Sequence, residues 1–119
     1  MVGPLIRGDW SVRLQLLFLA SVVAPIVEET MFRGVLYRQL RQASARFGYA
    51  PSVLVSILIV SFIFAAIHPQ GWLAIPPLMS VAIAFNFVRE WRGSLVPSMV
   101  AHGVHNGLLT LIAFFALSG

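Results

Sequence analysis

The sequence predicts an all-α membrane protein, a polytopic bundle of about four transmembrane helices. Of its 119 residues, 59% are hydrophobic and only 10% are charged, and the mean hydropathy is +0.89. A soluble domain of this length cannot bury so much apolar surface. The apolar residues gather in four runs separated by Gly, Pro, Ser and Arg, with no internal repeat. We therefore expect a single transmembrane domain over residues 1–119.

The charge and cysteine content exclude several other classes of protein. The formal net charge is +4 and the pI is about 11.2, but the arginines cluster at the ends of apolar runs. That placement is typical of membrane topology and not of a nucleic-acid groove. Because there is no cysteine, disulfides, thiolate zinc sites and cysteine nucleophiles are excluded. The run 14–27 imitates a secretory signal cleaved at Ala24, but Pro25 would follow the cut, so a membrane anchor is favoured.

The first apolar segment begins near Trp10 and should continue past Glu29 to a stop at Gly48. Pro25 could kink it and Gly34 could loosen it, but neighbouring helices tolerate both within a membrane. Its last part, GVLYRQLRQASARF, is amphipathic and should leave the bilayer. One face carries Leu36, Leu40, Ala43 and Phe47, and Arg38, Arg41 and Arg46 lie mostly away from it.

Three further segments follow. They cover about residues 51–68, 72–90 and 94–117. Pro76 and Pro77, near the beginning of the third segment, could delay its regular part until after them. Ser94, which follows Gly93, is a good N-cap for the last segment.

The distribution of arginine predicts the orientation in the membrane. One set of helix ends carries Arg38, Arg41, Arg46, Arg89 and Arg92, and the other carries Arg7 and Arg13. The end with more arginine should face the cytoplasm. Trp10, Trp72 and Trp91 lie at segment ends, as interfacial aromatic residues do.

Two adjacent acids lie at membrane depth. Glu28 and Glu29 precede Arg38 by about 15 Å of helix. A charge there costs roughly 2.5 to 3.5 kcal/mol, so such residues usually face a bundle interior or a water-filled cavity. Glu29 and Arg33 have the favoured i, i+4 spacing of an ion pair. Glu28 has no base at i+3 or i+4 and is the candidate to accept a proton from water. The structural alternative is that both acids hold helices together through Arg33.

Two other segments carry a polar turn each. Phe64 and His68 are one helical turn apart at the end of the second segment, and His102 and Asn106 are i and i+4 in the fourth. His105 lies close to the latter face. A single histidine in an apolar helix is more often a packing residue, but polar turns on three segments favour one shared site. Helical rise places the three at about one depth.

These polar turns resemble the motifs of a known family. EETMFRGVL, FAAIH and HGVHN match the EExxxR, FxxxH and HxxxN motifs of the CAAX prenyl protease and bacteriocin-processing (CPBP, or ABI) intramembrane proteases. The stretch RGSLVPSMVAH also resembles the usual lead into the third motif. The resemblance covers about residues 24–107, and the three motifs in this order are specific.

The resemblance implies a glutamate-dependent endopeptidase in a bacterial or archaeal plasma membrane, with its site open to the cytoplasm. Glu28 and His68 would activate a water for attack on a peptide carbonyl, and His102 and Asn106 would stabilise the oxyanion. The supporting residues would be Glu29, Arg33 and Phe64. His105 has no role in the motif and is expected to pack nearby.

The resemblance also bears on cofactors and partners. No cofactor is required, but zinc is an alternative, because Glu28, His68 and His102 form a ligand set of some zinc hydrolases. No HExxH helix is present. We expect a peptide or protein substrate that could carry a lipid, contacts with membrane lipids, and no nucleic acid. The arginines at the cytoplasmic rim could contact lipid headgroups or a peptide carboxylate.

Two other classes of function stay open. One is a proteolytically silent scaffold or bacteriocin-immunity protein of the same fold, and the other is a fragment of a transporter or proton relay. Family members commonly have more membrane helices than this chain. It would therefore be the core of a larger fold, either without the helices that normally precede the first motif or assembled with copies of itself.

Overall fold

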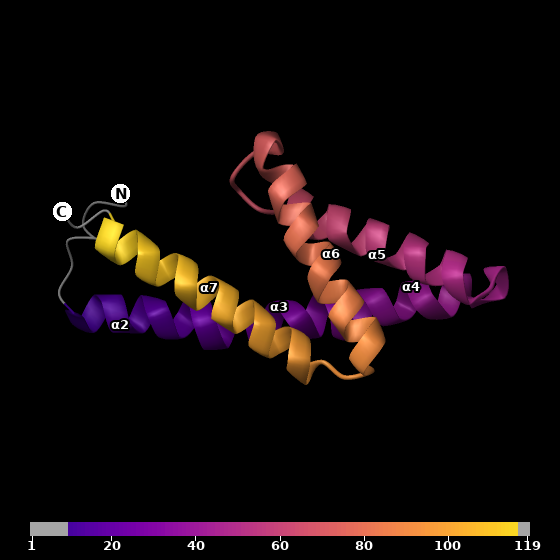
Figure 1. Ribbon diagram of the computed structural model, residues 1–119, viewed down its shortest axis with the longest axis horizontal. Helices are drawn as coiled ribbons and strands as arrows, with labels where there is room; N and C mark the ends of the chain where they lie inside the picture. Colours follow the sequence, from indigo (N-terminus) through magenta and orange to yellow (C-terminus); the bar gives the residue numbers. More distant parts are fainter. Residues whose placement is uncertain (1–9, 117–119) are drawn as a thin grey trace. The chain divides into compact units, whose positions relative to one another are not determined.

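The structure, a computed structural model, describes residues 10–116 and is all-helical over that range, with no strand between Trp10 and Ala116. Four of its helices are long and apolar enough to cross a membrane, and Figure 1 shows their course. The predicted all-α fold with about four spans is therefore confirmed. The contribution of Arg7 to the orientation and the end of the last segment at Leu117 lie outside the described residues.

The first helix runs without a break from Trp10 to Phe47. It comprises α2 (Trp10–Phe18), the π-helical turn η1 (Leu19–Val23), α3 (Ala24–Glu29), the π-helical turn η2 (Thr30–Leu36), α4 (Tyr37–Ser44) and the 3-10 turn η3 (Ala45–Phe47). Gly48 ends it with a φ of 94°, in a region that glycine adopts without steric cost. The predicted continuation past Glu29 and the stop at Gly48 are confirmed.

The remaining helices follow the predicted segments closely. They are α5 (Tyr49–Ala66), the 3-10 turn η4 (Trp72–Ala74), α6 (Ile75–Arg92) and α7 (Val96–Ala116). Pro76 and Pro77 do not delay α6, because they lie in its first turn, where a missing N–H breaks no helical hydrogen bond. Ser94 caps α7, since its Oγ accepts the Val96 N–H at 3.3 Å.

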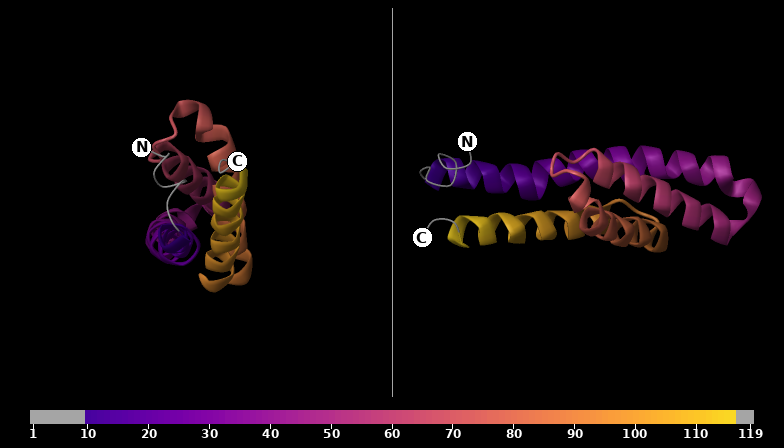
Figure 2. Two further views of the ribbon diagram at one scale, coloured as in Figure 1. Left: turned by 90° about the vertical axis from the view of Figure 1, so that its left-hand side faces the viewer. Right: turned by 90° about the horizontal axis from the view of Figure 1, so that it is seen from above.

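The chain forms two compact units, which we describe separately. Of the described residues, unit 1 comprises 10–27 and 99–116, and unit 2 comprises Glu28–Ser98. In unit 1, α2 and the part of α7 from Met99 onward lie side by side and antiparallel, as Figures 1 and 2 show. Organisation as a single domain stays a prediction.

Unit 2 packs α4 and α6 against α5 (Figure 2). Its buried core consists of Phe32, Tyr37, Ile57, Val60, Phe64 and Ala82. Leu36 and Leu40 pack against this core, but Ala43 and Phe47 are exposed. Only two of the four residues on the predicted apolar face therefore pack against the core. Tyr37 and Arg41 take inward positions instead, which the hydrophobic pattern did not assign to them.

Candidate functional site

Glu29 and Arg33 form the predicted ion pair at the centre of unit 2. Arg33 Nη1 lies 3.2 Å from Glu29 Oε1, and both side chains are fully buried. The i, i+4 spacing brings the two groups to one face even though the π-helical turn η2 begins between them. The predicted pairing is confirmed, and it commits the Glu29 carboxylate to the interior of the unit.

Arg33 also joins its helix to α6. Its Nε donates to Asn86 Oδ1 at 2.9 Å, and its Nη2 donates to the Ala82 carbonyl at 3.0 Å. Asn86 Nδ2 in turn donates to Ser61 Oγ on α5 at 2.8 Å. A buried charge is tolerated in such a place when pairing and hydrogen bonds replace its hydration. The structural alternative, in which an acid holds helices together through Arg33, therefore describes Glu29 well.

Aromatic rings complete the surroundings of Arg33. Its Cζ lies 5.0 Å from the ring centroid of Phe64 and 5.4 Å from that of Phe85. A guanidinium is attracted to ring faces at such distances. Phe64, which the sequence predicted as a supporting residue, thus packs against the Arg33 guanidinium.

His68 lies just beyond the end of α5, in the turn that follows Ala66. Its ring centroid is 4.4 Å from that of Phe64, and its Nδ1 is within hydrogen-bond distance of the Phe64 carbonyl oxygen. The two residues therefore contact each other as their spacing predicts. Because a carbonyl oxygen only accepts, Nδ1 carries the hydrogen of this contact.

Glu28 precedes the buried Glu29 by one residue and is partly buried. Successive residues of an α-helix point about 100° apart, because one turn contains 3.6 residues. Glu28 therefore leaves the helix in a different direction from Glu29. The two neighbouring acids therefore differ in burial, and the ion pair with Arg33 belongs to Glu29.

Asn106 belongs to unit 1, where it contacts the π-helical turn η1. In this turn the Ala24 N–H donates to the Leu19 carbonyl, so it is displaced from the Ala20 carbonyl, its acceptor in a regular α-helix. The next donor in π-helical register would be residue 25, but Pro25 has no N–H. Asn106 Nδ2 donates to this Ala20 carbonyl at 3.0 Å. The carbonyl that Pro25 leaves without a helical donor thus anchors the Asn106 side chain.

Small residues bring α7 close to η1 in unit 1. A Cβ added to Gly103 would lie 2.5 Å from the Ser21 carbonyl oxygen, a distance that real Cβ atoms essentially never show. His102, next to Gly103, is buried, whereas His105 and Asn106 are partly buried. The close approach at Gly103 positions the motif residues of α7 within this unit.

Asn86 is the residue of this region that the sequence analysis missed. Its partners Arg33 and Ser61 belong to other helices, so spacing along α6 did not indicate them. The available signal was a lone amide within the apolar run VAIAFNFV. Such an amide in a membrane helix usually bonds to another helix.

A comparison with known proteins decides the family. Residues 10–108 match the family described as type II CAAX prenyl endopeptidase Rce1-like. The chain belongs to this family. The membrane-embedded CAAX protease MroQ of Staphylococcus aureus (strain USA300) is 24% identical to this Rce1-like chain over 95 residues, which are 80% of this chain and 38% of that protein. No solved structure matches the chain significantly.

Family membership and the four apolar helices make the chain a membrane protein of a CAAX protease family. It spans only 38% of the length of the curated relative. Within either unit, the described residues form no group of three His, Asp or Glu side chains that could hold a metal ion. Zinc ligation by Glu28, His68 and His102 would draw on both units and stays a prediction.

Proposed function

We propose that this Rce1-like chain carries the catalytic residues of an intramembrane endopeptidase that hydrolyses a peptide bond with an activated water. The observation that supports this most is the difference between the two adjacent acids. Glu29 forms the buried ion pair with Arg33, so we assign a structural role to its carboxylate. Glu28 points in another direction and is the acid to which we assign the chemistry.

In the proposed reaction, Glu28 accepts a proton from a water that His68 helps to orient. The resulting hydroxide attacks the carbonyl carbon of the scissile bond, and the carbonyl oxygen becomes an oxyanion. His102 and Asn106 donate hydrogen bonds to that oxyanion. The C–N bond then breaks, and the proton held by Glu28 passes to the leaving nitrogen.

The anchoring of Asn106 is compatible with this role. A side-chain amide has two N–H donors, and the Ala20 carbonyl accepts one of them. That bond fixes the orientation of the amide and leaves the second N–H to serve the oxyanion. A donor held in place before the reaction stabilises developing charge without a cost of reorientation.

The substrate is a peptide or protein, and the family description suggests one that ends in a prenylated C-a-a-X sequence. We propose that the site opens to the cytoplasm of a bacterial or archaeal cell, in line with the arginine distribution. Bacteriocin immunity, a proteolytically silent scaffold and a proton or solute path are alternative functions of the same residues.

Cleavage of a reporter peptide tests the proposal. The chain in lipid nanodiscs would receive an internally quenched peptide with a farnesylated C-a-a-X end. Glu28→Gln and His68→Ala should each lower kcat/KM by at least roughly 100-fold, since general acid–base groups contribute on that order. His105→Ala is the matched control, because it removes a histidine of α7 that has no role in the motif.

Cleavage that survives Glu28→Gln would contradict the mechanism. A folded wild-type chain that cleaves neither farnesylated nor unmodified peptides would favour the silent scaffold or the immunity protein. Proton flux in proteoliposomes that depends on Glu28 would favour the transport alternative.

A further inference from the structure

A second polar region of unit 2 lies at the arginine-rich ends of α4 and α6. There, a pocket of about 330 Å³ opens between the two helices. Its polar lining consists of Tyr37, Arg38, Arg41, Gln42, Arg89 and Glu90. Three guanidinium groups therefore face one carboxylate, and the lining carries excess positive charge.

The single acid of the pocket is already engaged. Glu90 Oε1 lies 2.9 Å from Arg41 Nη2, and the Tyr37 hydroxyl donates to Glu90 Oε2 at 2.8 Å. Arg41 also donates through Nη1 to Ser52 Oγ at 2.6 Å. Arg41, Tyr37 and Glu90 thus form a closed network that fixes the wall of the pocket. The excess charge belongs to Arg38 and Arg89.

Arg89 lines the pocket with a donor that the described residues leave unsatisfied. Its Nε is buried from solvent and has no hydrogen-bond partner between residues 10 and 116. A buried N–H without an acceptor is costly, and the cost is larger for a charged group. An anion in the pocket would supply the acceptor. Planar guanidinium groups match the geometry of phosphate oxygens particularly well.

The same end of unit 2 carries the aromatic residues expected at a membrane surface. Phe47, Tyr49 and Trp91 are each exposed over more than half of their surface. Arg46 lies 4.8 Å from the ring centroid of Phe47, and Arg92 lies 5.5 Å from that of Trp91. Exposed aromatic rings mixed with arginine are typical of the headgroup level of a bilayer.

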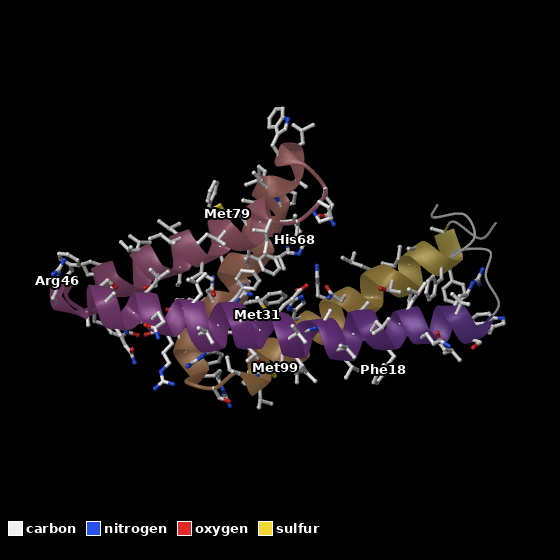
Figure 3. All side chains as sticks on the ribbon, turned by 180° about the vertical axis from the view of Figure 1, so that it is seen from behind. Phe18, Met31, Arg46, His68, Met79 and Met99 are labelled. Atoms are coloured by element: carbon white, nitrogen blue, oxygen red, sulfur yellow. The ribbon has the colours of Figure 1, made fainter. Side chains whose placement is uncertain are left out.

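The pocket lies far from His68, the candidate catalytic residue just beyond the end of α5. Ser52, which bonds to Arg41, and Phe64, which contacts His68, are separated by about 18 Å of helix. Figure 3 shows Arg46 and His68 toward opposite ends of α5. A substrate carboxylate bound beside His68 would not reach this pocket, so a lipid is the better occupant.

We infer that this pocket binds the phosphate of an anionic phospholipid, with Arg38 and Arg89 as its ligands. Basic pockets between membrane helices bind such headgroups through charge and shape together. Arg41, held by Glu90, Tyr37 and Ser52, shapes the wall. The lipid would fix α4 against α6 at the membrane surface.

Native mass spectrometry of the full chain tests this inference. Protein released from nanodiscs that contain phosphatidylglycerol and phosphatidylcholine should retain phosphatidylglycerol. Arg38→Gln and Arg89→Gln should each lower that retention at least roughly fivefold, because each removes a charge-assisted hydrogen bond to the phosphate. Arg92→Gln is the matched control, because it removes an arginine from the same end of α6 outside the pocket lining.

The charge-conserving variant Arg89→Lys separates a built site from general attraction. It should still lose part of the retention, because lysine lacks the planar fork of arginine. Circular dichroism would verify that each variant keeps its helices. Should Arg89→Gln lose its helices, Arg38→Gln carries the test alone, since Arg38 is exposed.

Three results would overturn the inference. The first is an equal loss of lipid retention in Arg92→Gln and Arg89→Gln, which would mean that general charge attraction holds the lipid and not a built site. The second is displacement of the lipid by millimolar inorganic phosphate, which would mean that the pocket recognises free phosphate. The third is displacement by a peptide with a free C-terminus but not by its amide, which would assign the pocket to a peptide carboxylate. Lipid retention that falls in Arg38→Gln and Arg89→Gln but not in Arg92→Gln supports the lipid site.

Discussion

At Arg33, a charged side chain is fully buried, and its surroundings explain how the fold tolerates it. The guanidinium has one ion pair with Glu29, one hydrogen bond to Asn86 and one to the Ala82 carbonyl. Breaking a buried pair by neutralising one partner leaves the other charge uncompensated, which is far more costly than the net contribution of the pair. Glu29 is therefore expected to matter mainly for stability.

Substitution of each acid tests this division of roles. Glu29→Gln should lower the free energy of unfolding by about 3 to 5 kcal/mol, because Arg33 stays buried without its counter-charge. Glu28→Gln, the matched control, should change it much less. Unfolding in mixed micelles, followed by circular dichroism, measures both. Equal losses in the two variants would contradict the division, whereas Glu29→Gln combined with Arg33→Met should recover part of the stability.

The sequence predicted the Glu29–Arg33 pair because both partners lie on one helix at a fixed spacing. It could not predict the bond from Arg33 to Asn86, because that bond exists only once α6 packs beside the first helix. The positions of Glu28, His68, His102 and Asn106 in one site remain a prediction for the same reason. A shared site depends on packing between segments that are distant in the sequence.

Among the elements, the first helix departs most from regular geometry. Its length was predictable from the apolar run, from the amphipathic extension that follows it and from the stop at Gly48. The π-helical turns η1 and η2 were not predicted, although Pro25 and Gly34 were the residues expected to disturb the helix. Pro25 has its effect through the N–H that it lacks, which leaves the Ala20 carbonyl to Asn106. Such turns are frequent at functional sites.

The close approach of α7 to η1 makes Gly103 a test of the packing in unit 1. Gly103→Ala should lower the free energy of unfolding by about 1 to 3 kcal/mol, because its Cβ would overlap the Ser21 backbone and force the helices apart. Gly107→Ala is the matched control, because a Cβ there would lie 3.4 Å from Ser21 Cβ, an ordinary contact. Thermal unfolding in detergent would compare the two. A Gly103→Ala variant no less stable than Gly107→Ala would contradict the close packing, since alanine by itself favours a helix over glycine.

In the molecule as a whole, the candidate residues are divided between the two units. Glu28 and His68 belong to unit 2, and His102 and Asn106 belong to unit 1. Each unit has its own internal contacts. The fold of one unit therefore does not depend on the candidate catalytic side chains of the other. Hydrolysis, in contrast, would require residues of both. A measurement of activity therefore reports on residues of both units, whereas a measurement of stability can report on the contacts of one unit alone.

The absence of cysteine allows the predicted orientation to be measured directly, because wild-type protein gives no background in thiol labelling. Gln42→Cys places a thiol near the arginine-rich helix ends, and Ser11→Cys places one near the opposite end of the first helix. Both wild-type side chains are exposed. If the arginine-rich ends face the cytoplasm, an impermeant maleimide should label Ser11→Cys in intact cells and Gln42→Cys only after permeabilisation.

The reverse labelling pattern would place the arginine-rich ends outside the cell. It would also move the basic pocket of Arg38 and Arg89 to the outer leaflet, where a negative surface potential is weaker than on the cytoplasmic side. A variant with Arg38, Arg41 and Arg46 all changed to Gln provides a second control, because lowering the charge difference should make the labelling of Ser11→Cys and Gln42→Cys more alike. Unchanged labelling in that variant would mean that other residues determine the orientation.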